Sequence, residues 1–171
     1  KTTKTKTKDT KTAMADADLK ALAEVHHVNQ MEIGAAKLAL KQGTAKIKDY
    51  ANSLVTDHTS NDKDLMALAK KKTVTVPAHV PQTDAETAKM KDMTDTMAKL
   101  AKLKGADFDT AYLATMATAH DDVAAKLAVH ITAASDADVK TFLTMTKPVI
   151  ELHAKRAKDL LAAAATQLPK T

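Results

Sequence analysis

Cysteine is absent from the sequence, and glycine, proline and aromatic residues are scarce. Without cysteine the chain can form neither disulfide bonds nor thiolate metal sites. Three glycines and four prolines are too few to punctuate a many-stranded β fold. With 2% aromatic residues, the core must be built from Ala, Leu, Val and Met, which suits packed helices better than sheets. These shortages favour an all-α fold for a chain of 171 residues, the size of one domain.

Positive charge is concentrated at one end of the chain. Residues 1–12 contain five lysines and one aspartate, which accounts for +4 of the net charge of +5. The remainder is close to neutral and offers neither a basic helix face nor aromatic stacking platforms, so nucleic acid is not expected as a partner. No run of about 20 apolar residues occurs, so no transmembrane segment is expected either.

The Lys/Thr-rich beginning and the rest of the chain have different predicted roles. We expect residues 1–15 to be a disordered tail, because the segment has little apolar surface to bury. A solvated linker is its simplest interpretation, and contact with an envelope or another anionic surface is a second hypothesis. Residues 16–168 are expected to form a single helical domain.

Apolar residues recur at helical spacing in four long segments. The first begins at Asp16 or Asp18, either of which could cap it, and ends near Gln42. Gly43-Thr44 is a short turn into a second helix that ends near Lys72. Two further long helices are expected at about 107–132 and 137–167, the latter capped by Ser135-Asp136. The predicted inward stripes are Leu22, Val25, Ile33, Ala36, Leu40; Ile47, Ala51, Leu54, His58, Asn61, Leu65, Leu68; Leu113, Met116, His120, Val123, Leu127, Ile131; and Phe142, Met145, Val149, His153, Arg156, Leu160.

Residues 73–83 interrupt the helical pattern with two prolines and several β-branched residues, which predicts an extended crossover. A shorter helix follows from Thr83 or Asp84, with Met90, Met93, Met97 and Leu100 as its stripe, and Gly105 is expected to end or bend it. Methionines at this spacing are typical of core, although thioethers also bind Cu(I). Two hairpins joined by a long crossover predict an antiparallel four-helix bundle of the ferritin-like kind, with an extra short helix.

Three histidines occupy stripe positions on different helices: His58, His120 and His153. Glu32 lies one position before the stripe on the first helix. At the helical rise, Glu32 and His58 lie about 17 and 22 Å from the turn that joins their two helices. His120 and His153 lie about 21 and 28 Å from the turn that joins theirs. Helical side chains lean toward the amino-terminal end of their helix, which reduces the difference in height between the two residues of each pair. We therefore expect the four side chains to meet near the middle of the bundle.

Three imidazoles and a carboxylate are suitable ligands for Zn²⁺, and also for iron, manganese or copper. Asn61 and Asp62, one turn after His58, are expected to orient its ring by hydrogen bonds without contacting the metal themselves. A dinuclear ferritin site needs Glu-x-x-His on two helices, but Val55, Ala117 and Ile150 stand three residues before the histidines. A mononuclear site is therefore preferred. The alternative is that the histidines are core residues held only by hydrogen bonds.

Several short motifs together resemble a known bacterial family. They are Met31-Glu32-Ile33, the segment ANSLVTDHT at 51–59, the segment GADFD at 105–109 with Tyr112-Leu113, then His120, and Pro148 with His153. In combination they resemble the secreted or periplasmic proteins of unknown function labelled "predicted outer membrane protein" and grouped with ferritin-like folds. The resemblance implies export by a signal peptide and no established activity. The family's characteristic acids and histidines fall on Glu32, Asp57, His58, His120 and His153, with Asp57 placed behind the ligands.

The leading hypothesis is therefore a non-enzymatic, exported helical bundle that binds one divalent transition metal, with zinc favoured. Glu32, His58, His120 and His153 are the expected ligands, and no catalytic residue is identified. One alternative is an iron-dependent ferritin-like oxidase or stress protein that uses the same site. The other is a purely structural interaction module.

Overall fold

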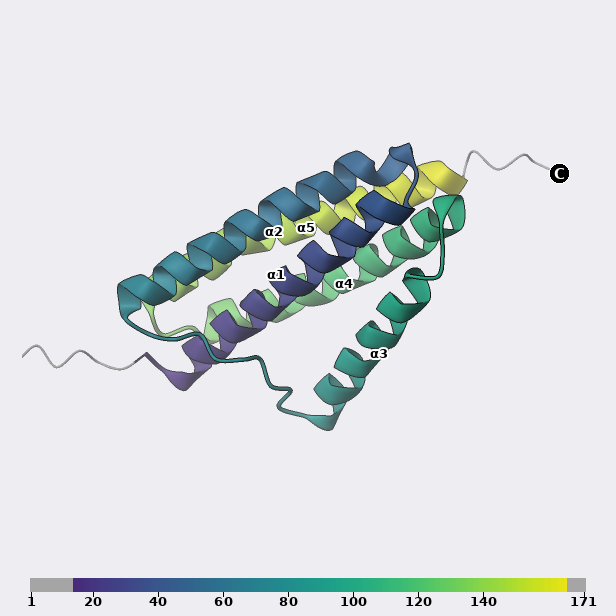
Figure 1. Ribbon diagram of the computed structural model, residues 1–171. Helices are drawn as coiled ribbons and strands as arrows, with labels where there is room; N and C mark the ends of the chain where they lie inside the picture. Colours follow the sequence, from purple (N-terminus) through teal and green to yellow (C-terminus); the bar gives the residue numbers. More distant parts are fainter. Residues whose placement is uncertain (1–13, 166–171) are drawn as a thin grey trace, which may run out of the picture.

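A computed structural model describes residues 14–165 (Figure 1). It contains α1 (Asp16–Gln42), α2 (Ala45–Lys72), α3 (Asp84–Leu100), α4 (Gly105–Ala133) and α5 (Ala137–Ala165), with no strand in this part of the chain. The all-α prediction is confirmed, as is the long crossover before an extra short helix. Residues 1–13 of the expected tail, and 166–168 of the expected domain, lie outside the described residues.

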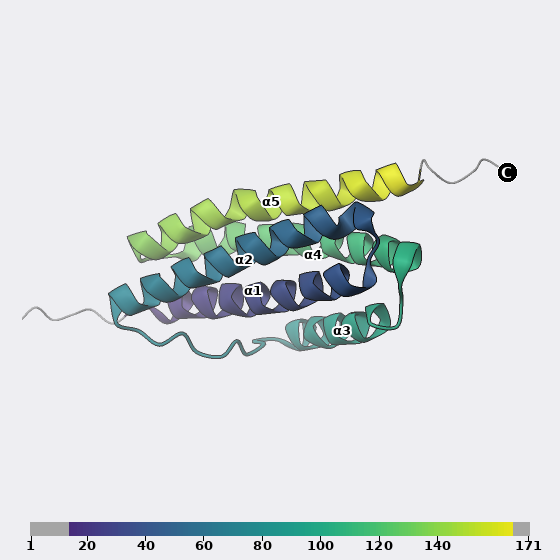
Figure 2. The same ribbon diagram turned by 45° about the horizontal axis from the view of Figure 1, so that its top comes forward.

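Four long helices form the bundle, and α3 lies outside it beside α1 and α4 (Figures 1 and 2). The tightest pairs are the hairpins α1–α2 and α4–α5; α1 also packs on α4, and α2 on α5. Each helix therefore runs antiparallel to both of its neighbours, an arrangement compatible with the ferritin-like prediction. Within residues 14–165, none of the helices has the length and apolar content needed to cross a membrane.

Side-chain caps start two of the long helices, α2 and α5. The hydroxyl of Thr44 accepts a hydrogen bond from the backbone N–H of Lys46 at the start of α2. Asp136 accepts from the N–H groups of Asp138 and Val139 at the start of α5. The cap predicted for α1 is wrong, because Ala15 occupies that position and makes no side-chain cap. Gly105, expected to end or bend α3, instead begins α4 with a positive φ of 60°.

Asp18 and Asp109 tie the two hairpins together at opposite ends of the bundle. Asp18, buried on α1, accepts hydrogen bonds from the N–H and hydroxyl of Ser135 and from the N–H of Asp136, in the α4–α5 turn. Asp109, buried on α4, accepts from the N–H and hydroxyl of Thr44, in the α1–α2 turn. Each hairpin thus supplies a carboxylate that satisfies backbone donors in the turn of the other.

Asp18→Ala is expected to lower the free energy of unfolding by about 3 kcal/mol, because it leaves three donors without their charged acceptor. Asp16→Ala is the matched control. The side chain of Asp16 is 80% exposed and, among residues 14–165, forms an ion pair only with Lys20 on its own helix, so its loss should change stability by less than about 0.5 kcal/mol. Urea unfolding of both variants measures the difference. Equal effects would show that the inter-hairpin contact contributes nothing.

The core consists of two apolar clusters with a polar layer between them. One cluster lies toward the α1–α2 turn and includes Tyr50, Phe108 and Tyr112. The other lies toward the α4–α5 turn and includes Leu22, Leu65 and Leu127. Between them is the polar layer, whose buried members are Asn29, Glu32, His58, His120, Thr146 and His153. Polar side chains from all four bundle helices therefore meet halfway along the molecule.

The predicted stripes of α2 and α4 largely match the buried residues, but those of α1 and α5 need correction. On α1 the next two buried positions after Val25 are Asn29 and Glu32, whereas Ile33 is only half-buried. On α5 the buried face is shifted by one residue and carries Leu143, Thr146 and Ile150. Met145 and Val149, predicted to be core, are 70% and 38% exposed.

Candidate metal centre

His58, His120 and His153 come together in the polar layer from α2, α4 and α5. All three are buried, with at most 2% of each residue exposed. Their ring centroids are 5.3–5.7 Å apart. One nitrogen from each ring lies within 4.8 Å of the others. The expected meeting of these three histidines, which were chosen from their stripe positions, is thus present in the structure.

Each imidazole is oriented by one hydrogen bond to an oxygen acceptor. Nδ1 of His58 donates to Oδ1 of Asn29 at 2.9 Å, and Nδ1 of His120 donates to the carbonyl oxygen of Met116 at 2.9 Å. Nε2 of His153 donates to Oδ2 of Asp57, also at 2.9 Å. A carbonyl or carboxylate oxygen can only accept, so each of these ring nitrogens carries the proton in a neutral imidazole. The other nitrogen of each ring therefore presents a lone pair.

Those second nitrogens have no protein partner. Among the residues that the structure describes, five buried side-chain nitrogen or oxygen atoms lack a hydrogen bond, and three of them are Nε2 of His58, Nε2 of His120 and Nδ1 of His153. Buried polar atoms without a partner are costly and rare, and three at one point in the fold call for an explanation. A cluster of histidines held only by mutual hydrogen bonds would not leave three acceptor lone pairs side by side.

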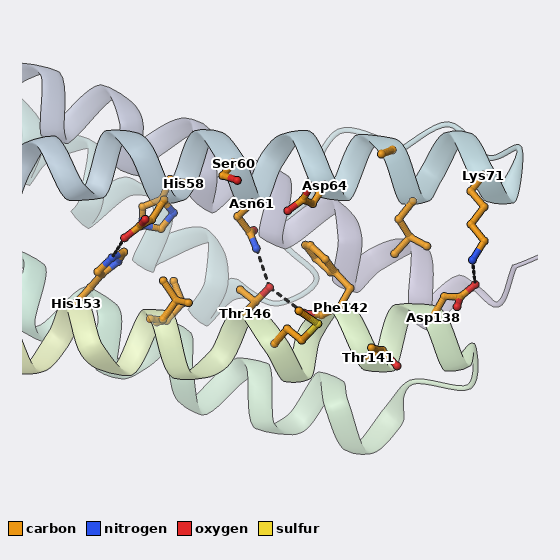
Figure 3. Close-up of a pocket in the computed structure, with 16 residues that line it drawn as sticks. His58, Ser60, Asn61, Asp64, Lys71, Asp138, Thr141, Phe142, Thr146 and His153 are labelled. Carbon is orange, nitrogen blue, oxygen red and sulfur yellow. Dashed lines mark hydrogen bonds and ion pairs between the residues drawn. The ribbon is translucent and has the colours of Figure 1, made fainter.

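A chain of hydrogen bonds extends from His58 across the bundle. Asn29 accepts from His58 and donates through Nδ2 to Asn61 at 2.8 Å. Asn61 in turn donates to the hydroxyl of Thr146, which donates to the carbonyl oxygen of Phe142 (Figure 3). Each amide is used in both directions, which fixes its orientation. The chain therefore holds the ring of His58 in place from three different helices.

The other two unpartnered atoms are Oε2 of Glu32 and the hydroxyl of Tyr112. Oε1 of Glu32 lies 4.0 Å from Nδ1 of His120, on the side of the ring that faces Met116 rather than the other histidines. Burial raises the pKa of Glu32, and the proximity of His120 only partly offsets that effect. Burial and the nearby Glu32 also raise the pKa of Tyr112. Glu32 is thus an acid placed behind one histidine.

Burial also lowers the pKa of two of these histidines, His58 and His153. It lowers the pKa of His58 to about 3, with repulsion from His120 and His153 acting in the same direction. The pKa of His153 is lowered too, mainly by burial, although its hydrogen bond to Asp57 opposes the shift. Both rings are therefore neutral at pH 7, which is the form that binds metals.

The metal-free protein should lose stability between pH 7 and pH 5. In that range the unfolded chain protonates His58 near pH 6.5 but the folded chain does not, so stability rises with pH, and the loss at pH 5 is about 2 kcal/mol. Glu32 acts in the opposite direction, because its raised pKa makes the folded chain the better proton acceptor. The measurement is therefore the difference between wild type and His58→Gln in urea unfolding at pH 7 and pH 5. An identical pH dependence in both proteins would contradict the burial effect on His58.

The residues predicted to support the site are distributed differently in the structure. Asp62 does not orient His58; its carboxylate accepts from His26 at 2.6 Å and from Gln30 at 2.8 Å. Asn61 reaches His58 only through Asn29, and Asp57 supports His153 instead. Glu32 joins the polar layer but is not in the group whose ligand atoms lie within 4.8 Å of one another.

Asn29 and the carbonyl group of Met116 were not predicted to take part. Asn29 stands three residues before Glu32 and four after Val25, so it continues the inward face of α1. That spacing is the signal in the sequence that could have identified it. The identity of residue 116 could not indicate that its backbone carbonyl group accepts a hydrogen bond from His120.

His58, Asp57 and His153 also line one end of a cleft between α2 and α5 (Figure 3). The cleft has a volume of about 620 Å³, and much of its wall is apolar, with Leu68, Phe142 and Ile150 among the lining residues. The ion pair between Lys71 and Asp138, at 3.0 Å, lies at the other end. Asp57 is 43% exposed, so the outer side of His153 lies close to solvent.

Fold and site together define a helical-bundle domain with a buried cluster of three histidines. Residues 3–160 match the family described as Domain of unknown function (DUF4142), and the chain belongs to that family. The predicted membership of a family of unknown function is thereby confirmed. No functionally curated protein matches the sequence.

A solved structure has a similar fold. It is the "Crystal structure of DUF305 fragment from Deinococcus radiodurans", with a TM-score of 0.77 over 89% of this chain and 99% of that one. The two sequences are 12% identical, so the likeness concerns the fold alone.

Proposed function

We propose that this domain binds one divalent transition metal ion, with zinc favoured, through His58, His120 and His153. The observation that carries the proposal is the set of three unpartnered ring nitrogens, each with its opposite nitrogen fixed by an oxygen acceptor. Hydrogen bonding of the outer nitrogen is the usual arrangement behind metal-bound histidines, where it sets the tautomer and ring direction.

The geometry suits a small tetrahedral ion. Zinc binds imidazole nitrogen at about 2.0–2.1 Å, which places two tetrahedral donors about 3.4 Å apart. One nitrogen from each ring lies within 4.8 Å of the others, so small side-chain rotations bring three donors to that spacing. Three histidines leave a fourth position for water or another ligand. A donor set made only of imidazoles suits zinc or copper better than manganese, which prefers oxygen.

Charge balance also supports a divalent ion. Asp57 and Glu32 lie behind His153 and His120 respectively, and neither is within the group of closely spaced ligand atoms. In their ionised forms they would supply two negative charges around the three rings. A buried divalent cation would therefore be compensated without a carboxylate ligand, which matters because uncompensated buried charge is strongly unfavourable.

Zinc titration of chelator-treated protein tests the proposal. We expect one zinc ion per chain, with the same stoichiometry in His79→Ala, which removes a histidine from the crossover. The triple variant His58→Ala/His120→Ala/His153→Ala should bind none at this site. Unchanged stoichiometry in the triple variant would exclude the proposed ligands. Uptake of iron with oxygen consumption would favour the oxidase alternative.

We propose the cell envelope as the location of the protein. The support is the resemblance of its motifs to an exported family and the Lys-rich segment 1–12, whose charge suits an anionic surface. Fractionation of cells that express the full gene product tests this. Recovery only with the cytoplasmic fraction would contradict it.

A further inference from the structure

A second groove lies between α1, α3 and α4, away from the α2–α5 cleft. It has a volume of about 450 Å³, and its lining contains five of the eight methionines in the sequence. Met90, Met93 and Met97 come from α3, Met31 from α1 and Met116 from α4. No residue from α2 or α5 lines this groove. Methionines from three helices therefore line a single groove.

The methionines of α3 are not core residues, which corrects the interpretation from their spacing. Leu100 is the only buried residue of α3, whereas Met90, Met93 and Met97 are half-buried. Their spacing of three and four residues places them on one face of the helix, and that face borders the groove. Both views show α3 as an outer helix beside the bundle (Figures 1 and 2). The three methionines consequently line the groove, and Met97 also packs against the core cluster near the α1–α2 turn.

Charge in the groove favours a cation. Two lysines line it, and both are paired: Lys89 with Asp122 at 2.6 Å, and Lys126 with Glu24 at 2.5 Å. The lining also contains three carboxylates that make no ion pair with either lysine, which are Glu32, Glu86 and Asp92. The stacked rings of His27 and His79, with centroids 5.2 Å apart, add imidazole nitrogens to the same lining.

We infer that this groove binds Cu(I) through the thioethers of Met90, Met93 and Met97. Thioether sulfur is a soft, uncharged donor, and it selects soft monovalent copper over zinc, which prefers nitrogen, oxygen or thiolate. The carboxylates of Glu86 and Asp92, which take no part in the histidine centre, supply the compensating negative charge. This site shares no ligand with the histidine centre and does not depend on whether that centre binds metal.

Competition with a Cu(I)-specific chelator under anaerobic conditions tests the inference. The variant Met90→Leu/Met93→Leu/Met97→Leu replaces three thioethers with side chains of similar volume, so the fold should be retained. The control Met14→Leu/Met66→Leu/Met145→Leu removes the same number of sulfur atoms outside the groove. We expect Cu(I) affinity to fall at least 100-fold in the groove variant and less than threefold in the control. Equal affinities in the two variants would overturn the inference.

Two further measurements test Cu(I) binding to the groove without the histidine centre and without relying on the folding of the leucine variants. In the variant His58→Ala/His120→Ala/His153→Ala, Cu(I) binding to the groove should persist with wild-type affinity. X-ray absorption of the Cu(I)-loaded form of that variant should show copper–sulfur scattering. A copper environment of nitrogen and oxygen alone would overturn the inference, whatever the leucine variants do.

Discussion

His120→Ala is expected to lower the affinity for zinc more than 100-fold, the largest effect that the site predicts. The variant removes one of three nitrogen donors contributed by separate helices. Losing a group that only orients a ligand typically costs 10–100-fold in affinity, so losing the ligand itself should cost more. Competition with a zinc chelator of known affinity measures the change.

Asp57→Asn is the matched comparison, because asparagine has nearly the same size and shape as aspartate but carries no charge. The amide can still accept a hydrogen bond from Nε2 of His153, so this change should lower zinc affinity about 10-fold. A loss in Asp57→Asn as large as that in His120→Ala would mean that Asp57, rather than the three rings, dominates binding. No loss in His120→Ala would remove His120 from the site.

Zinc at a thousand times its dissociation constant should raise the free energy of unfolding by about 4 kcal/mol, because only the folded chain brings the three rings together. For a domain of this size, that gain corresponds to an increase of roughly 8–16 °C in the midpoint of thermal unfolding. Scans with zinc, and then with excess chelator, measure the increase and its reversal. Wild-type behaviour in His58→Ala/His120→Ala/His153→Ala would show that zinc acts elsewhere on the protein.

The meeting of the histidines could be predicted because each lies on a helix whose inward face is set by regular apolar spacing. His120 has the buried residues Met116 and Ala124 four positions to either side, and His58 has Leu54 four positions before it and Leu65 seven after it. The turns fixed how far each histidine lies along the bundle. The helical rise per residue then gives the distance of each histidine along the bundle axis from its position in the sequence. The level of the site thus followed from the turn positions, the helical rise and the lean of helical side chains toward the N-terminus.

Where prediction failed, the apolar pattern itself was ambiguous. On α1, Asn29 and Glu32 replace apolar residues on the inward face, so the pattern shifted to Ile33. On α5, both faces carry apolar residues, and the exposed Met145 and Val149 imitate a core stripe. Periodicity can identify an apolar face, but it cannot choose between two of them.

The partners of the histidines were less accessible to prediction, because they depend on how the helices are rotated against one another. Asp62 is one turn from His58 on the same helix, yet its carboxylate faces His26 on α1. Asn29, on the neighbouring helix, takes the place beside the ring. Sequence spacing fixes neighbours within a helix, whereas contacts between helices require their relative rotation.

The reciprocal contacts of Asp18 and Asp109 have a consequence for the centre that lies far from both. His58 belongs to one hairpin, and His120 and His153 to the other. Sliding one hairpin along the other by a single helical turn would displace His58 by about 5.4 Å, more than the present separation of the ligand atoms. Because each carboxylate holds the opposite hairpin's turn, the pair fixes the axial register in both directions. The two ends of the molecule thereby keep its middle aligned.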